Sequence, residues 1–175
     1  MSTDREMFHQ SIPAKNVISR ALKCLPLNNK NTKYDPTMKG IEHIDHEGVR
    51  YAEIIWRDAT TTKTRFFSPP ESSFQFGLLA HESGFHEAAH YHRAYRRTID
   101  DLQQMFVMQR GVVVIELYDN NKMPIREVTL RTGDAIVLIH GIHALRVVED
   151  FQAISVKHGP FLGAENDKIN VEVKK

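Results

Sequence analysis

Two histidines separated by one residue are the strongest candidates for chemistry in this chain. They are His90 and His92, in the segment GFHEAAHYH that begins at Gly84. Side chains two positions apart on a strand point to the same face, so both imidazoles would project together. Imidazole binds several first-row metals and also titrates near neutral pH. The spacing predicts a metal site or an acid–base pair on the inner wall of a barrel, and a polar surface strand is the alternative interpretation.

A glycine on either side extends the histidine pattern. Five residues separate Gly84 from His90, and Gly111 follows after a longer gap. This arrangement resembles the first motif of the cupin superfamily, in which a glutamate stands seven positions before the closing glycine. Here that position holds Gln104, and we interpret residues 93–103 as an inserted loop.

A second group of residues resembles the other cupin motif. Gly133, Gly141 and His143 follow in its order, with Ile139 where the motif has proline. The resemblance covers about residues 74–158, and it implies an all-β fold, a single jelly-roll barrel, with a bound divalent metal ion (Fe, Mn, Ni or Zn). The implied metal ligands are His90, His92, Gln104 and His143.

Glutamine in place of glutamate has a chemical consequence for this implied metal site. A set of three histidines and a carboxylate carries one negative charge, whereas the set with Gln104 is neutral. Because an amide oxygen is a weaker donor to a divalent cation than a carboxylate, we expect weaker metal binding. A register shift of one residue would put Gln103 in its place.

Three classes of function follow from the resemblance. The segment Gly159–Phe161 is similar to the tail of small bacterial metal-binding cupins, which predicts a metal-dependent dioxygenase or isomerase. Similarity to cupins that isomerise keto-sugar nucleotides implies a metal-free enzyme of carbohydrate metabolism, with His90 or His92 as the catalytic base. A non-catalytic small-molecule-binding module is the third interpretation.

The residues beside the histidine pair predict how a substrate is recognised. His86 would line the mouth of the site, together with Tyr91. Arg96 and Arg97 could hold a carboxylate or phosphate through paired hydrogen bonds. We therefore expect a small polar or anionic substrate. A solvated loop, neutralised by the two aspartates that follow, is the alternative interpretation.

Hydrophobic periodicity predicts the elements that must position these residues. Apolar residues at helical spacing indicate a short helix over residues 13–25. From residue 41 the pattern changes to short strands with turn signals between them, which favours a sandwich or barrel. Residues 1–60 are expected to form an arm, the helix and outer strands, and residues 61–175 the barrel. The strands are expected at Val49–Trp56, Arg65–Phe67, Phe74–Ala80, Met105–Gln109, Val112–Tyr118, Ile125–Leu130, Ala135–Ile139, Ala144–Val148 and Phe151–Lys157.

Composition excludes several other classes of protein. The 175 residues carry a net charge of +1, so no basic surplus attracts nucleic acid or an anionic membrane. The single Cys24 cannot form an internal disulfide. The polar N-terminus lacks the apolar segment of a signal peptide, and we expect a cytoplasmic protein. Barrels of this kind commonly dimerise through edge strands, so we expect a homodimer that shares the Val49–Trp56 strand.

Overall fold

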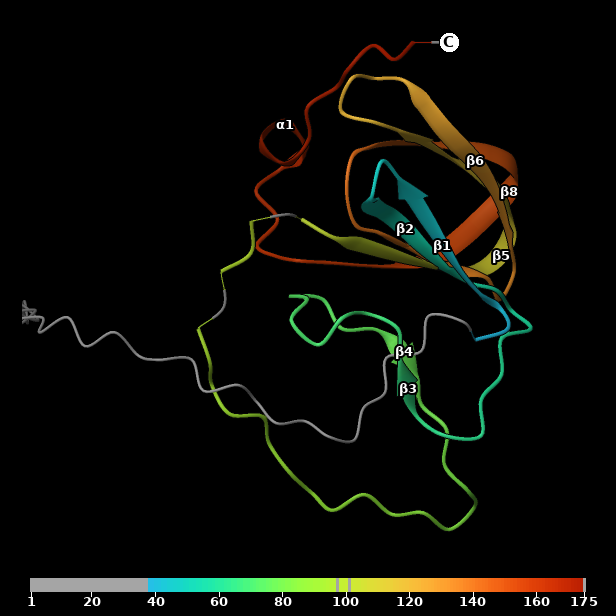
Figure 1. Ribbon diagram of the computed structural model, residues 1–175, viewed down its shortest axis with the longest axis vertical. Helices are drawn as coiled ribbons and strands as arrows, with labels where there is room; N and C mark the ends of the chain where they lie inside the picture. The colour runs from blue at the N-terminus through green and yellow to red at the C-terminus, as the bar shows by residue number, and fades with distance from the viewer. Residues whose placement is uncertain (1–37, 97, 101, 175) are drawn as a thin grey trace, which may run out of the picture. The chain divides into compact units, whose positions relative to one another are not determined.

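Strand pairing organises the part of the chain that the structure describes (Figure 1). The predicted helix over residues 13–25 and Arg97 lie outside the described residues. The computed structural model describes residues 38–96, 98–100 and 102–174.

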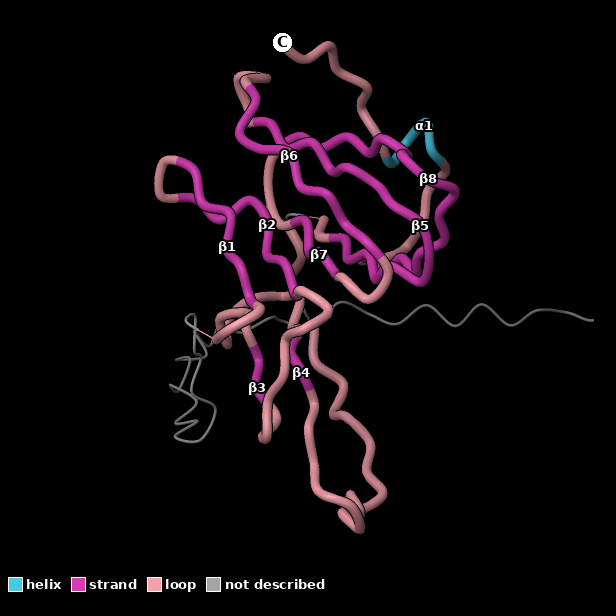
Figure 2. The backbone as a smooth tube through the Cα atoms, turned by 90° about the vertical axis from the view of Figure 1, so that its right-hand side faces the viewer, coloured by secondary structure: helices cyan, strands magenta, loops and turns pink. Residues whose placement is uncertain are grey.

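The main sheet has six antiparallel strands, and the long strand β5 is paired along both of its edges. β5 pairs β6 and β7 along one edge and β8 along the other, and β2 joins β7 to β1. Figures 1 and 2 show the sheet curling on itself. Its strands are β1 (Ile41–His46), β2 (Val49–Ile55), β5 (Gln104–Tyr118), β6 (Pro124–Arg131), β7 (Ala135–Leu138) and β8 (Ile142–Lys157).

A small hairpin and one helical turn complete the described elements. β3 (Arg65–Phe66) pairs β4 (Gly77–Leu78) as a separate two-stranded sheet, and α1 covers Ala164–Asp167. The all-β class predicted from the sequence is confirmed for the described residues. No helix among them is long and apolar enough to cross a membrane.

Two predicted strand breaks are absent from the structure. The strands expected on either side of Gly111 are one strand, β5, because this glycine forms a bulge with a φ of 80°. The bulge inserts a residue without ending the pairing. The turn expected at Glu149 and Asp150 is also wrong, since β8 runs through it with register shifts opposite the bulge.

The histidine pair does not lie on a strand. The described residues among 79–103 form no strand, so the predicted strand around His90 and His92 is wrong. Glu87 and the two alanines after it belong to residue types depleted in strands. Both edges of the nearby strand β5 are already paired, which leaves this segment no edge of that strand to join.

The expected dimer strand is also an interior strand. β2 pairs β1 along one edge and β7 along the other. Residues Ala52–Ile55 therefore present no free edge to a second copy, so over this part the candidate dimer strand is not an edge strand. β1 and β2 belong to the same sheet as β5 to β8.

Apolar side chains form one cluster on each face of the sheet. On one face, Ile54, Ile115 and Leu130 are almost fully buried together. On the other face, Val137 packs with Phe67 and Phe76 from the β3–β4 hairpin. The bulge keeps the first cluster continuous along β5. Side chains that point into this cluster have even residue numbers before Gly111 and odd residue numbers after it.

Candidate small-molecule site

A pocket lies where the β7–β8 connection meets the first residue of β5. Its volume is about 290 Å³, close to the lower end of the range for ligand sites. Its lining mixes apolar walls with four polar side chains. The apolar walls are Leu102, Leu138, Ile139 and Ile142, and the polar side chains are Gln104, Asn120, His140 and His143.

Strand register brings Gln104 and His143 to this pocket from distant parts of the sequence. Gln104 begins β5 and lies opposite Leu138, the last residue of β7. The connection from β7 then turns at once into β8, which places His143 opposite Leu117. The turn requires Gly141, which has a φ of 78°. A Cβ atom there would lie 2.4 Å from the ring of Tyr51.

Gln104 is held on the sheet by a neighbouring strand. Its amide nitrogen donates a hydrogen bond of 2.9 Å to the hydroxyl oxygen of Ser155 on β8. This bond orients the amide, so its carbonyl oxygen is the atom that can accept a hydrogen bond from a ligand.

His143 supplies the titratable group of the pocket. Desolvation lowers the pKa of its imidazole from the usual value of 6.5, and the positive charge of Lys168 lowers it further. The side chain is nevertheless exposed, because part of its surface lines the open pocket. At neutral pH the imidazole is therefore uncharged, with one nitrogen that donates and one that accepts.

Sequence reasoning missed two of the polar residues. The amide nitrogen of Asn120 lies 3.1 Å from Nε2 of His140. The His140 ring also meets Tyr51 edge-on, with ring centroids 5.3 Å apart. The turn signal at residues 119–121 correctly located Asn120 in a turn, but no pattern in the sequence showed that this turn faces the β7–β8 connection.

The other predicted site residues lie elsewhere, in the segment of residues 79–103. The rings of His90 and His92 are 5.2 Å apart and nearly perpendicular. Nδ1 of His90 lies 3.0 Å from the Ala88 carbonyl oxygen and 3.8 Å from the Glu87 carboxylate. Both imidazoles are exposed, and neither belongs to the pocket lining. The predicted substrate residues His86, Tyr91 and Arg96 are also exposed.

The described residues do not fit the four-ligand metal site. Gln104 and His143 share a pocket, whereas the histidine pair lies in the exposed segment. Within the described ranges, no three His, Cys, Asp or Glu side chains are grouped closely enough to hold a metal ion.

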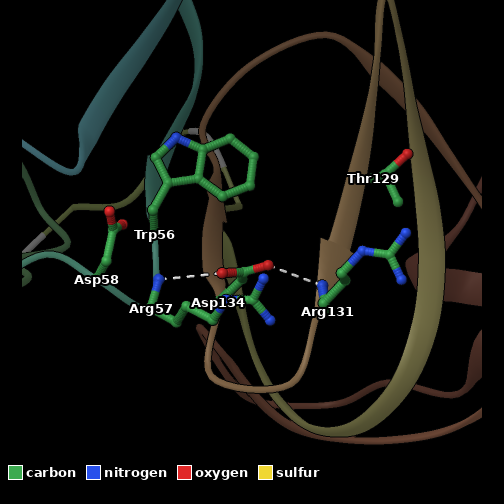
Figure 3. Close-up of a pocket in the computed structure, with 6 residues that line it drawn as sticks. All are labelled: Trp56, Arg57, Asp58, Thr129, Arg131 and Asp134. Atoms are coloured by element: carbon green, nitrogen blue, oxygen red, sulfur yellow. Dashed lines mark hydrogen bonds between the residues drawn. The ribbon is translucent and has the colours of Figure 1, made fainter.

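A second pocket, of about 330 Å³, is built around a structural carboxylate (Figure 3). Asp134 is 3% exposed, and its two oxygens accept hydrogen bonds from the backbone nitrogens of Arg57 and Arg131. These bonds tie the β6–β7 turn to the residue that follows Trp56. Because both oxygens are engaged, the role of this carboxylate is to hold the turn.

No known family model, curated protein or solved structure matches this chain.

Proposed function

We propose that this chain is a cupin-type jelly-roll protein that binds a small polar molecule between Gln104 and His143. One observation carries the proposal: four polar side chains from three separate segments converge on one pocket with apolar walls. Such a mixture is typical of small-molecule sites, in which the apolar surface provides affinity and the polar groups fix orientation.

The chemistry of the lining favours an uncharged ligand. Gln104 and Asn120 carry no charge, desolvation disfavours the charged form of His143, and none of the described lining residues is a carboxylate, Lys or Arg. These groups offer both donors and acceptors. A sugar or another hydroxyl- and carbonyl-bearing molecule satisfies both kinds of group.

The lowered pKa of His143 supports a catalytic form of the same proposal. A neutral imidazole accepts a proton, and a general base works best when its pKa lies near the working pH. His143 would then take the proton from the carbon beside a carbonyl group, as a keto-sugar isomerase requires. In this form of the proposal His143 replaces His90 and His92 as the base.

Binding is tested by NMR titration of the full-length protein with neutral hexoses and with a deoxythymidine-diphosphate keto-sugar. We expect shifts at Gln104 and Asn120, and a loss of at least tenfold in affinity for His143→Ala, because the variant loses a donor and an acceptor. His86→Ala, in the exposed segment, is the matched control and keeps its affinity. Shifts confined to residues outside the pocket would contradict the proposal.

Metal binding by the cupin ligand set stays a prediction. It requires the segment of residues 79–103 to bring His90 and His92 to Gln104 and His143. Elemental analysis of protein purified without a metal column should then show near-stoichiometric Fe, Mn, Ni or Zn. Gln104→Glu should bind the metal more tightly in a chelator competition, because it adds a negative charge to a neutral set. Equal or weaker binding would show that Gln104 is not a ligand.

Assembly and location also stay predictions. We propose a homodimer and a cytoplasmic protein, as the sequence suggests. Since β2 is paired on both edges, a dimer must use another surface. Sedimentation equilibrium of the full chain measures its mass directly.

A further inference from the structure

A smaller pocket lies on the opposite side of strand β5 from Gln104. Its volume is about 180 Å³, roughly the share of six water molecules in the liquid. Neighbouring strand residues point to opposite faces, so Gln103 lines this pocket whereas Gln104 lines the other one. The segment 68–76, next to the β3–β4 hairpin, forms the other wall, and Ser72, Phe74 and Phe76 line it.

A buried carboxylate with an unsatisfied oxygen lines this pocket. The Glu53 side chain is 1% exposed. Its Oε1 accepts a hydrogen bond from Nη1 of Arg50 and lies 3.3 Å from Nδ1 of His43. Its Oε2 is buried and has no hydrogen-bond partner among the described residues. Buried polar atoms are nearly always paired, so an orphaned carboxylate oxygen in a pocket calls for a donor.

The charges around Glu53 favour a cation. Arg50 is shared, because it also pairs with Asp45 on β1, with Nη2 3.3 Å from Oδ2. Among the described residues, the two carboxylates therefore share one guanidinium, which itself lines the pocket. Desolvation raises the pKa of Glu53, with His43 and Arg50 opposing that effect, so a positive partner would stabilise the charged form.

The walls of the pocket suit the apolar part of such a ligand. The rings of Phe74 and Phe76 lie 6.5 Å apart, tilted by 38°. Aromatic faces attract cations as well as alkyl groups. We propose that this pocket binds a small alkylammonium ion, whose N–H donates to Oε2 of Glu53 and whose alkyl chain packs against Phe74 and Phe76.

The probe for this site is n-butylammonium chloride, with n-butanol and sodium butyrate as matched neutral and anionic probes. Each is titrated into the full-length protein at constant ionic strength, and the backbone amides of Phe76 and Gln103 are followed by NMR. We expect saturable shifts with n-butylammonium, at least tenfold weaker binding of n-butanol, and no saturation with butyrate.

Three variants locate the binding. Ser72→Phe fills the pocket and should weaken n-butylammonium binding at least tenfold. Ser73→Phe is the matched control, because Ser73 is exposed and lies outside the lining, and it should bind as the parent does. Glu53→Gln keeps the shape but removes the charge, and where it folds it should lose the preference for the ammonium over the alcohol.

Several results would overturn the proposal. Equal affinity for n-butanol and n-butylammonium would show that the carboxylate takes no part. Unchanged n-butylammonium affinity in Ser72→Phe, or an equal loss of affinity in Ser72→Phe and Ser73→Phe, would show that the ion does not bind in this pocket. The site is independent of the sugar pocket, so failure here leaves the His143 proposal standing.

Discussion

At the scale of single residues, desolvation shifts the pKa values of Glu53 and His143 in opposite directions. It raises the pKa of Glu53 and lowers the pKa of His143, because in both cases the surroundings disfavour the charged form. The opposite directions follow from the opposite charges. The acid therefore calls for a positive partner, whereas the imidazole is kept neutral and ready to accept a proton.

The lowered pKa of His143 predicts a pH dependence of stability. As pH falls below the usual histidine value of about 6.5, the unfolded chain takes up a proton before the folded protein does. The unfolded state then binds more protons, so the stability contribution of His143, complete above that pH, is lost as pH falls through the lowered folded pKa.

Urea unfolding between pH 8 and pH 5 measures this effect. The parent protein should lose more stability over that interval than His143→Gln, which has no such proton to bind. Direct NMR titration of the His143 ring should give a midpoint below that of a free histidine, and Lys168→Ala should raise it. A midpoint at or above the free value would contradict the assignment.

At the scale of elements, one glycine decides whether β5 is one strand or two. Gly111 adopts a positive φ, and a Cβ atom there would lie 2.2 Å from the carbonyl oxygen of Asp150 on β8. The close approach keeps β8 paired past the bulge, so the long β5–β8 ladder remains continuous. That ladder extends from Gln104, at the first end of β5, to the pairing of Leu117 with His143 near the other.

Gly111→Ala should therefore destabilise the protein strongly. The left-handed backbone costs about 1–3 kcal/mol for a residue with a side chain, and the clash with β8 adds to it. Gly48→Ala is the control, because Gly48 has a φ of 78° but nothing within 4 Å of the new Cβ atom. Urea unfolding measures the loss of unfolding free energy in both variants. Gly48→Ala reports the backbone strain alone, and Gly111→Ala reports the strain together with the clash. Equal losses would mean that β8 moves away from the new side chain without cost.

At the scale of the whole described structure, the main sheet carries a core on each face. The second core exists only because the β3–β4 hairpin supplies Phe67 and Phe76 to Ile55 and Val137. The alkylammonium pocket lies beside this contact and shares Phe76 with it. Docking of the hairpin therefore determines both a core and a candidate site.

Replacing Phe67 by alanine measures how much the packing of the β3–β4 hairpin on the sheet stabilises the protein. Phe67 is fully buried, so Phe67→Ala should cost about 3–5 kcal/mol of unfolding free energy. Phe85→Ala is the control, because Phe85 is 57% exposed and its ring stacks on that of His81. A single unfolding transition is expected in urea, and a loss below 1 kcal/mol for Phe67→Ala would show that the hairpin opens independently.

Local chemistry in the sequence determined the strand content and the turns. β-Branched and aromatic residues predicted β2, and Asp and Asn are typical of the turn after Tyr118, where Oδ1 of Asp119 accepts from the Met123 nitrogen at 2.7 Å. Because side chains alternate along a strand, Gln103 and Gln104 line different pockets. These features depend on neighbouring residues, so they can be read along the chain.

Tertiary pairing alone decided which residues share a pocket. His90 and His92 have strand-like spacing, but a strand needs a partner edge, and both edges of β5 are taken by β7 and β8. Conversely, Asn120 and His140 carry no motif and meet where the end of β5 pairs with the start of β8, at Tyr118 and Ile142. A hydrogen-bonding edge and a strand register are properties of segments far apart in sequence, and no local pattern contains them.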